Sequence, residues 1–297
     1  MKKLIIGSRK SRMAITQTNE FINKFLLSNP HFKRENVEIK TIATSGDINQ
    51  IDRLDSIGGK GLFIKEIEQM LLRGKIDVAV HSMKDMPTLM TAGTKISAWL
   101  PRGDHHEALV NNQNKSIMEL EPNSVIGTSS IRRRSQVLSL RTDLVIKLIR
   151  GNVDTRIDKL NRKEYDALIL GHGGIKRLNF EHKVTQIFSI NEILPPACQA
   201  SIGIQTLEED NELISLISNT NHQDSSIIGI TERKVLEVLG ANCNSPIGVY
   251  ASIRDNEIHL KTEIFSHDGK EKFYAEDSSK VFDHVNLANK VGGMIID

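Results

Sequence analysis

Short apolar segments of strand length alternate with helical segments along most of this chain, and that alternation restricts its fold more than any other feature. It is typical of an α/β protein. The expected strands lie at residues 4–7, 37–43, 77–81, 95–100, 108–110, 125–127, 144–148, 167–170 and 202–206. Apolar residues recur on one face of 14–27, which predicts a helix, and further helices are expected at 62–72, 131–140 and 153–160.

Two proline-containing breaks indicate where the chain passes between domains. They are Pro101-Arg102-Gly103-Asp104 and Leu194-Pro195-Pro196-Ala197. If both connect the same two domains, the chain crosses a two-crossing hinge, as in a bilobal binding protein whose ligand lies between its lobes. We therefore assign residues 1–100 and 197–218 to domain 1, 101–196 to domain 2 and 219–297 to domain 3. The last is expected to hold a helix at 226–239, strands at 247–253 and 257–266, and a helix at 281–291.

Composition narrows the class of protein. No apolar run approaches the ~20 residues that a membrane-spanning helix needs, so no membrane contact is expected. The first residues become polar too soon for a signal peptide and read as a first strand. Two cysteines, Cys198 and Cys243, do not form a disulfide framework. The composition thus predicts a cytoplasmic protein with reduced thiols.

Positive charge is concentrated in one segment although the net charge is only +2. Residues 132–163 contain ten basic and three acidic side chains, which indicates an anionic partner. Aromatic residues make up 4% of the chain, and none lies among these arginines to stack on bases. A small polyanion therefore fits better than a nucleic acid.

The segment Asp77–Pro87 reads as a strand that runs out into a polar loop. Ligands of open α/β sheets bind beyond the carboxyl ends of strands, where Lys84 and Asp85 are expected. A carboxylate there can stabilise a developing cation. The alternative is a turn-forming aspartate before Pro87. His81 is expected to shape the strand end rather than react.

Three further strand ends carry cations. The first is Gly127-Thr128-Ser129-Ser130-Ile131-Arg132-Arg133-Arg134, a strand followed by hydroxyl groups and a helix start. Free N–H groups at a helix N-terminus bind anions, and arginine forks bind carboxylates. Arg150 and Arg156 repeat the pattern after the next strand, and Arg177 follows a third. The alternative is ordinary helix capping with a solvated basic face.

Two segments allow weaker interpretations. Gly58-Gly59-Lys60-Gly61-Leu62-Phe63 lacks the P-loop pattern and reads as a mobile lid or as a disordered surface loop. His105-His106-Glu107 invites a metal site, but adjacent histidines are expected to point apart and no further ligand has useful spacing. No metal is therefore expected.

Cys243 lies in a loop between an expected helix and an expected strand, with no second cysteine near it in sequence. A lone cysteine is often a small buried hydrophobic residue. Downstream of so many arginines, it can also be a covalent attachment point inside an anion-binding cleft.

Six segments, in order, resemble the porphobilinogen deaminase family: 58–63, 77–87, 127–133, 150–156, 165–177 and 243–248. The resemblance implies two lobes like a periplasmic binding protein, with a small C-terminal α+β domain. It implies a dipyrromethane cofactor joined by a thioether to Cys243. It also implies head-to-tail condensation of four porphobilinogen molecules with loss of ammonia, and release of hydroxymethylbilane by water. A monomer is expected.

The resemblance also implies roles for individual residues. Asp85 matches the catalytic aspartate. The cofactor-binding positions are Cys243, Lys84, Arg132, Arg133, Arg156, Ser129 and Thr128. The substrate-binding positions are Arg9, Arg150, Arg177, Gln17 and Ser82, and Lys60 and Phe63 belong to the lid loop.

Some positions depart from the family pattern. Cys198 and Ala200 stand where the family has glycines at the return crossing, and Asn242 stands in place of a glycine before Cys243. The family stretch Asp-Pro-Arg-Asp-Ala reads Asp104-His105-His106-Glu107-Ala108, and His172 and Ser56 are further departures. Two other functions stay open: a non-catalytic bilobal anion-binding or solute-binding protein, and a nucleic-acid binder that uses residues 132–163.

Overall fold

The computed structural model describes residues 3–44, 64–241 and 245–296. They form two compact units, one made of Met1–Gly103 and Ser201–Ile227 and the other of Asp104–Ala200 and Ile228–Asp297. The chain therefore passes between the units near residues 103, 200 and 227.

The first unit is built on a five-stranded mixed sheet in the order β2-β1-β3-β10-β4. Strands β1, β2 and β3 are parallel, whereas β10 runs antiparallel to both β3 and β4. The carboxyl ends of the three parallel strands therefore lie at one edge of the sheet, which is where open α/β sheets bind ligands. The strands are β1 (Leu4–Arg9), β2 (Val37–Ile42), β3 (Val78–Ser82), β4 (Thr94–Trp99) and β10 (Ile202–Leu207).

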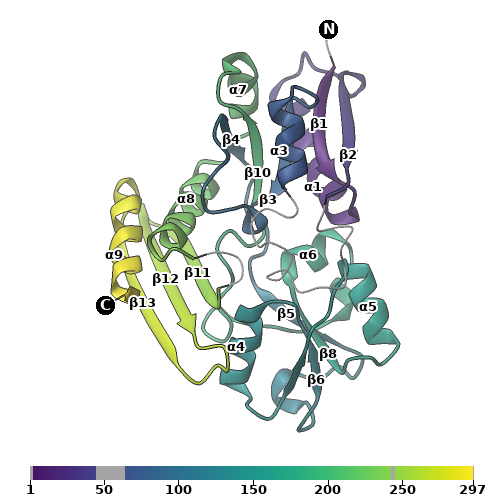
Figure 1. Cartoon of the computed structure of the whole chain (residues 1–297), viewed down its shortest axis with the longest axis vertical. Helices are drawn as coiled ribbons and strands as arrows, with labels where there is room; N and C mark the ends of the chain where they lie inside the picture. Colours follow the sequence, from purple (N-terminus) through teal and green to yellow (C-terminus); the bar gives the residue numbers. More distant parts are fainter. Residues whose placement is uncertain (1–2, 45–63, 242–244, 297) are drawn as a thin grey trace. The chain divides into compact units, whose positions relative to one another are not determined.

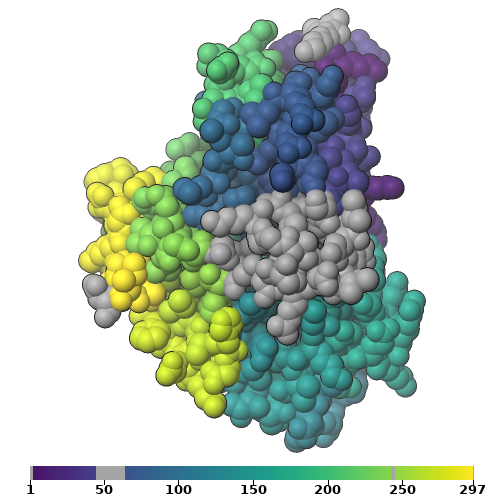
Figure 2. Space-filling view, viewed as in Figure 1, coloured from purple at the N-terminus to yellow at the C-terminus, as the bar shows by residue number. Residues whose placement is uncertain are grey.

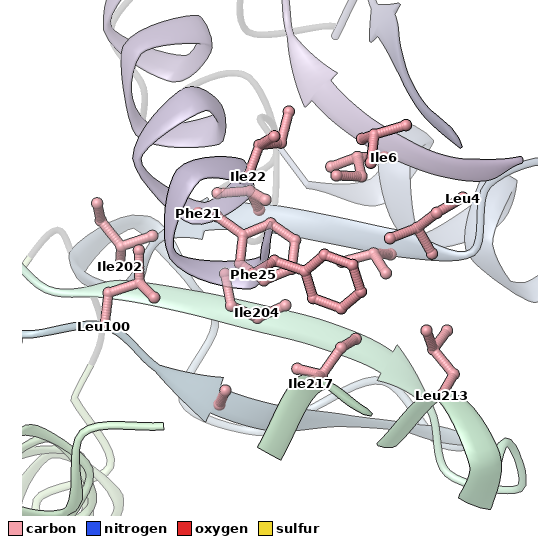
Figure 3. Packing of buried hydrophobic residues seen from close by; sticks show 14 residues of the cluster. Leu4, Ile6, Phe21, Ile22, Phe25, Leu100, Ile202, Ile204, Leu213 and Ile217 are labelled. Carbon is pink, nitrogen blue, oxygen red and sulfur yellow. The ribbon is translucent and has the colours of Figure 1, made fainter. Parts of the chain in front are cut away.

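Helices cover both faces of this sheet because apolar side chains alternate to both sides of its strands. On one face, Phe21 and Phe25 of α1 (Arg12–Ser28) pack against Ile6 and Ile204, as Figure 3 shows. The same cluster includes residues of α7 (Asn211–Ser218). On the other face, α3 (Lys65–Leu72) buries two side chains against Ala79 of β3. Ser11 caps α1 by accepting a hydrogen bond from the Ala14 N–H at 3.2 Å.

The second unit contains a sheet of the same design, in the order β7-β6-β8-β5-β9. Strands β6, β7 and β8 are parallel, and β5 runs antiparallel to β8 and β9. The strands are β5 (Glu107–Asn111), β6 (Val125–Gly127), β7 (Val145–Lys147), β8 (Ala167–Gly171) and β9 (Val184–Ile187). The accompanying helices are α4 (Ile131–Leu140), α5 (Val153–Asn161) and α6 (His172–Arg177) (Figure 1).

The C-terminal part of the second unit is an antiparallel sheet, β11-β12-β13, with α9 along it (Figure 1). Its elements are β11 (Ile247–Arg254), β12 (Glu257–Phe265), β13 (Lys272–Lys280) and α9 (His284–Ile296). Helix α8 (Gln223–Val238) packs closely on α9, because Gly292 lacks the Cβ that would lie 2.7 Å from a methyl carbon of Val238.

The turn between β12 and β13 lies against α4 (Figures 1 and 2). Ser135 Oγ of α4 donates to the His267 carbonyl oxygen at 3.4 Å. Gly269 has φ of +74°, and a Cβ built there would lie 2.3 Å from the Ser135 carbonyl oxygen. Glycine is needed at this turn for both its backbone conformation and its closeness to the helix.

The predicted α/β class is confirmed, with two sheet-and-helix lobes and a small C-terminal α+β domain. Helix α4 has the predicted bounds. The helix predicted at 62–72 is described only from Lys65, since residues 62 and 63 lie outside the described part of the chain. The helix expected at 281–291 was misplaced: α9 starts at His284, after a 3-10 turn.

Among the α-helices and strands of the described residues, α6 (His172–Arg177), α7, β9 and β13 were not predicted. The strand β13 is an edge strand with the polar sequence KFYAEDSSK, which lacks an alternating apolar pattern. The division into three domains stays a prediction. Among the helices of the described residues, none is both long and apolar enough to cross a membrane.

Candidate functional site

Asp85 and Lys84 lie in a 3-10 turn, Met83–Asp85, that follows β3 directly, and both residues are exposed. Met83 anchors the turn: its side chain is buried, and its N–H donates to the Ser201 carbonyl oxygen at 3.0 Å. Gly203 of β10 leaves room for it, since a Cβ there would lie 2.1 Å from the Met83 sulfur. The sequence therefore fixes the backbone next to Asp85 and leaves its carboxylate at the carboxyl edge of the sheet.

Ser82 and Gln17 are brought together beside this turn. Ser82 Oγ donates to Gln17 Oε1 at 2.9 Å, which joins the end of β3 to α1. Gln17 is buried on the sheet-facing side of α1. Arg9, the last residue of β1, is half-buried and lies at the same edge because β1 and β3 are parallel. Five predicted site residues of the first unit thus lie at or beside the carboxyl ends of two neighbouring strands: Arg9, Gln17, Ser82, Lys84 and Asp85.

His81 has a structural environment, in agreement with the expectation that it shapes the strand end. Its Nε2 lies 2.8 Å from Gln205 Oε1. The Gln205 Nε2 group donates to Glu68 Oε1 and to Thr94 Oγ1, both at 2.8 Å. That arrangement assigns Gln205 Oε1 as the acceptor and places the His81 proton on Nε2. Burial lowers the pKa of His81, so the imidazole is neutral near pH 7.

In the second unit, the loop after β6 and the start of α5 meet. Ser130 is the cap of α4, since its Oγ accepts from the Arg133 N–H at 3.3 Å. Ser129, just before it, accepts from Arg156 Nη2 at 3.3 Å. Arg156 Nε donates to the Gly151 carbonyl oxygen at 2.8 Å. The two strand-end motifs that the sequence suggested as separate anion sites therefore share one location, with Thr128 buried beside Ser129.

Arg132 and Arg133 are more enclosed than a simple anion-binding role requires. They are 3% and 7% exposed, and each forms an ion pair with Glu107, which is fully buried. Burial lowers the pKa of Arg132 to about 10, against the opposing effect of Glu107, so the group is still charged near pH 7. Glu107 was missed as a partner of these arginines. One feature of the sequence could have indicated it: an acidic residue is the first residue of the otherwise largely apolar strand Glu107–Asn111.

Arg150 and Arg177 are half-buried. Arg177 ends α6, and its Nη2 donates to the Ala200 carbonyl oxygen at 3.2 Å. The Arg150 carbonyl oxygen accepts from Lys159 Nζ at 3.4 Å. Both arginines follow parallel strands of the second sheet, β7 and β8, as the sequence indicated.

Asp104 binds two histidines where the chain enters the second unit. Its Oδ1 accepts from both the backbone N–H of His106, at 3.0 Å, and its Nδ1, at 2.8 Å, and its Oδ2 lies 2.8 Å from His172 Nδ1. Burial alone would raise the pKa of Asp104, but the hydrogen bonds from His106 and His172 lower it to about 2.

The expectation that His105 and His106 point apart was wrong. Their rings are stacked at 4.2 Å between centroids, and His105 also stacks on Tyr250 at 4.4 Å. Both residues precede β5 and lie outside any strand, so their side chains need not alternate.

The return crossing contains two residues with unusual backbone geometry. Cys198 and Ala200 have φ of +59° and +64°. Cys198 is buried, and its N–H donates to Glu232 Oε2 of α8 at 2.6 Å. Glu232 Oε1 also accepts from the Ala251 N–H of β11 at 2.8 Å. A buried carboxylate therefore ties the crossing to the C-terminal sheet. Three predicted site residues, Lys60, Phe63 and Cys243, lie outside the described residues.

Two family models match the chain. Residues 4–215 match "Porphobilinogen deaminase, dipyromethane cofactor binding domain", and residues 227–297 match "Porphobilinogen deaminase, C-terminal domain". Together they span nearly all of the sequence, including every predicted site residue.

Curated proteins and solved structures give further similarities. The chain is 42% identical over 286 residues to porphobilinogen deaminase of Lysinibacillus sphaericus, covering 95% of this chain and 91% of the relative. It is 38% identical over 297 residues to porphobilinogen deaminase of Staphylococcus epidermidis, covering 99% and 95%. A substrate-binding domain of a putative amino acid ABC transporter from Streptococcus pneumoniae is 16% identical, with a TM-score of 0.46 over 74% of this chain and 91% of that one.

Proposed function

Because this chain belongs to the porphobilinogen deaminase family, we propose that it is a hydroxymethylbilane synthase, a transferase of tetrapyrrole biosynthesis. It condenses four porphobilinogen molecules head to tail, with loss of one ammonia each, and releases hydroxymethylbilane by hydrolysis. The observation that carries this proposal is the match of both family models, which includes the aspartate at the end of β3 and the arginines of the second unit. A non-catalytic solute-binding protein would need neither Asp85 nor Cys243.

The residues present fit a dipyrromethane cofactor, whose carboxylates need cationic donors. The Nε atoms of Arg132 and Arg133 are buried and have no hydrogen-bond partner among the described residues. Buried donors of this kind are costly unless an acceptor reaches them. Cys243 would hold the group as a thioether, and Lys84, Thr128, Ser129, Arg132, Arg133 and Arg156 would bind its acid groups. When bound, it supplies the pyrrole position at which condensation begins.

Asp85 is assigned the catalytic role. Loss of ammonia from porphobilinogen leaves a cation shared with the pyrrole nitrogen. A carboxylate within hydrogen-bond reach of that nitrogen stabilises the cation and can help to move protons. The exposed turn at the end of β3 supports this assignment, because it presents the Asp85 carboxylate where a ligand can reach it while Met83 fixes the backbone.

Substrate binding is assigned to Arg9, Gln17, Ser82, Arg150 and Arg177, with Lys60 and Phe63 in a lid. Each porphobilinogen carries two carboxylates, so arginines that are half-buried at strand ends suit its recognition. The hydrogen bond from Ser82 to Gln17 leaves the Gln17 amide nitrogen as a donor. We also propose that the protein is a cytoplasmic monomer of three domains, with no nucleic-acid partner.

Intact-protein mass spectrometry tests the function directly. Two condensed porphobilinogen units add roughly 420 Da to the polypeptide, an amount expected for a covalent cofactor of this chemistry. We expect this addition in freshly purified protein, its loss in Cys243→Ser, and consumption of porphobilinogen by the parent alone. An unmodified mass together with no consumption of porphobilinogen favours the solute-binding function. Salt-dependent DNA binding by such protein favours the nucleic-acid function.

A further inference from the structure

One fully buried carboxylate joins the two arginines Arg132 and Arg133, which we call the arginine pair. Glu107 Oε1 is bonded to Arg132 Nη2, and Glu107 Oε2 lies 2.8 Å from Arg133 Nη2. Glu107 opens β5, whereas the arginine pair lies in the first turn of α4. A single side chain from another element therefore bridges both guanidinium groups.

Further hydrogen bonds hold the guanidinium groups of both arginines in place. Arg132 Nη1 donates to Gln136 Oε1 at 2.8 Å and to the Leu194 carbonyl oxygen at 2.7 Å. Arg133 Nη1 donates to the Ile169 carbonyl oxygen at 3.1 Å. In the part of the chain that the structure describes, the Nε atoms of both have no such acceptor. The described contacts of both arginines are thus made through their Nη atoms, and their Nε atoms are buried.

We propose that Glu107 is a positioning residue for the arginine pair: it holds both guanidinium groups in the orientation from which they bind the carboxylates of the bound ligand. This inference rests on the function proposed above. Two guanidinium groups side by side in a buried site repel each other, and one carboxylate paired with both removes most of that repulsion. The arginine pair retains one net positive charge after Glu107 is counted, which still attracts an acidic ligand.

Other charged groups near the arginine pair cannot replace Glu107. Glu263 of β12 acts on Arg132 electrostatically, and Gln136 Nε2 lies 3.5 Å from Glu263 Oε2. Glu263 is already paired with Lys272 of β13 at 2.5 Å. Its charge is therefore largely balanced, whereas Glu107 forms ion pairs with both arginines directly.

The test compares Glu107→Gln and Glu107→Asp with the parent. Glutamine keeps the size of the side chain and removes its charge. Aspartate keeps the charge, is one methylene shorter, and is the residue of the family stretch Asp-Pro-Arg-Asp-Ala. Asp143→Asn is the matched control, because it removes an ion pair with Arg141 beyond the other end of α4. The readouts are the fraction of protein carrying the added mass, KM and kcat for porphobilinogen, the unfolding midpoint, and calorimetric Kd for citrate as a polycarboxylate probe.

We expect Glu107→Gln to load a smaller fraction of its chains and to raise KM by about tenfold, with kcat of the loaded protein changed by less than about twofold, as for lost uniform binding. Glu107→Asp is expected to load fully, with KM about two- to fivefold above the parent. Asp143→Asn is expected to match the parent in loading and KM. A purely structural role of Glu107 would lower the unfolding midpoint and leave loading and KM unchanged.

Parent-like loading and KM in folded Glu107→Gln overturn the proposal. If Glu107→Gln does not fold, the KM of Glu107→Asp is the test instead. A parent-like KM in Glu107→Asp then overturns the proposal. Parent protein with neither added mass nor turnover contradicts the proposed function instead. In that case the Kd for citrate tests the role of Glu107. Weaker citrate binding in the variants supports its positioning role, and equal binding refutes it.

Discussion

Arg156 donates a hydrogen bond from Nη2 to Ser129 Oγ at 3.3 Å, and this contact joins the start of α5 to the loop after β6. The two residues are 27 positions apart in sequence, yet β6 and β7 are parallel neighbours, so the loops that follow them meet at one edge. In the first unit, the contact between Ser82 and Gln17 plays the corresponding part between β3 and α1. Each sheet thus gathers polar side chains at the carboxyl ends of its parallel strands.

Asp85→Asn is expected to fold normally and to reduce turnover by about a hundredfold or more, because the amide keeps the shape of the side chain and loses the charge that stabilises the cation. The backbone of the turn depends on Met83 and Ser201 rather than on the Asp85 carboxylate, so the unfolding midpoint should not change. Turnover of porphobilinogen by cofactor-loaded protein is the measurement. A turnover rate close to that of the parent would remove Asp85 from its assigned role.

Much of the fold was predictable because local patterns decide it. Helix α4 starts after the hydroxyl cap Ser130 and ends at Leu140, as expected from its sequence. The short apolar runs of β1, β3, β6 and β8 also placed these strands correctly. The position of β10 was not predictable. It pairs between β3 and β4 after more than 90 intervening residues, and no local pattern specifies such a distant, antiparallel partner.

The candidate site was predictable in its residue types and strand-end positions, but its internal pairing was not. The arginine-rich motif predicted anion binding, whereas the structure shows that Glu107 occupies two of those arginines. An ion pair between residues 107 and 132 depends on β5 lying beside β8 in the middle of the sheet. The similarity of the two sheets could not be predicted either. Their strand orders correspond, but their sequences show no repeat.

Ala200→Gly is expected to stabilise the protein by about 0.5–1 kcal/mol, because relief of a left-handed strain of about 1–2 kcal/mol exceeds the cost of about 0.4–1 kcal/mol that glycine adds through the freer unfolded chain. Ala200 has φ of +64°. The matched control is Ala197→Gly in the same crossing. Ala197 has no positive φ, and its replacement should cost about 0.4–1 kcal/mol through the greater freedom of the unfolded chain. Urea unfolding measures both, and a change of the same sign in both variants would contradict the strain at Ala200.

Gly269→Ala is expected to destabilise the protein by about 2–4 kcal/mol, because it combines backbone strain with overpacking against α4. The Cβ of an alanine there would lie 2.3 Å from the Ser135 carbonyl oxygen, and φ is +74°.

Two other glycines separate the contribution of backbone strain from that of overpacking. Gly74 has φ of +60° and open space, so Gly74→Ala should cost about 1 kcal/mol. Gly293 lies in α9 with open space, so Gly293→Ala should stabilise by about 0.5–1 kcal/mol. Equal effects of Gly269→Ala and Gly74→Ala would show that the hairpin does not press on α4.

Asp104→Asn is expected to destabilise the protein near neutral pH, and the effect should disappear in acid. The pKa of Asp104 is lowered from 3.8 to about 2 in the folded protein by its histidine partners, despite burial. A carboxylate with a lowered folded pKa contributes stability above its unfolded pKa, and that contribution is lost as pH falls through the folded value. After allowance for solvent screening of this partly exposed group, we expect a difference of about 1 kcal/mol in the free energy of unfolding between parent and variant above pH ~5.

Urea unfolding at a series of pH values should show this difference shrinking between pH 4 and pH 2. A difference that stays constant over that range would mean that the ionised carboxylate of Asp104 does not stabilise the crossing through His106 and His172.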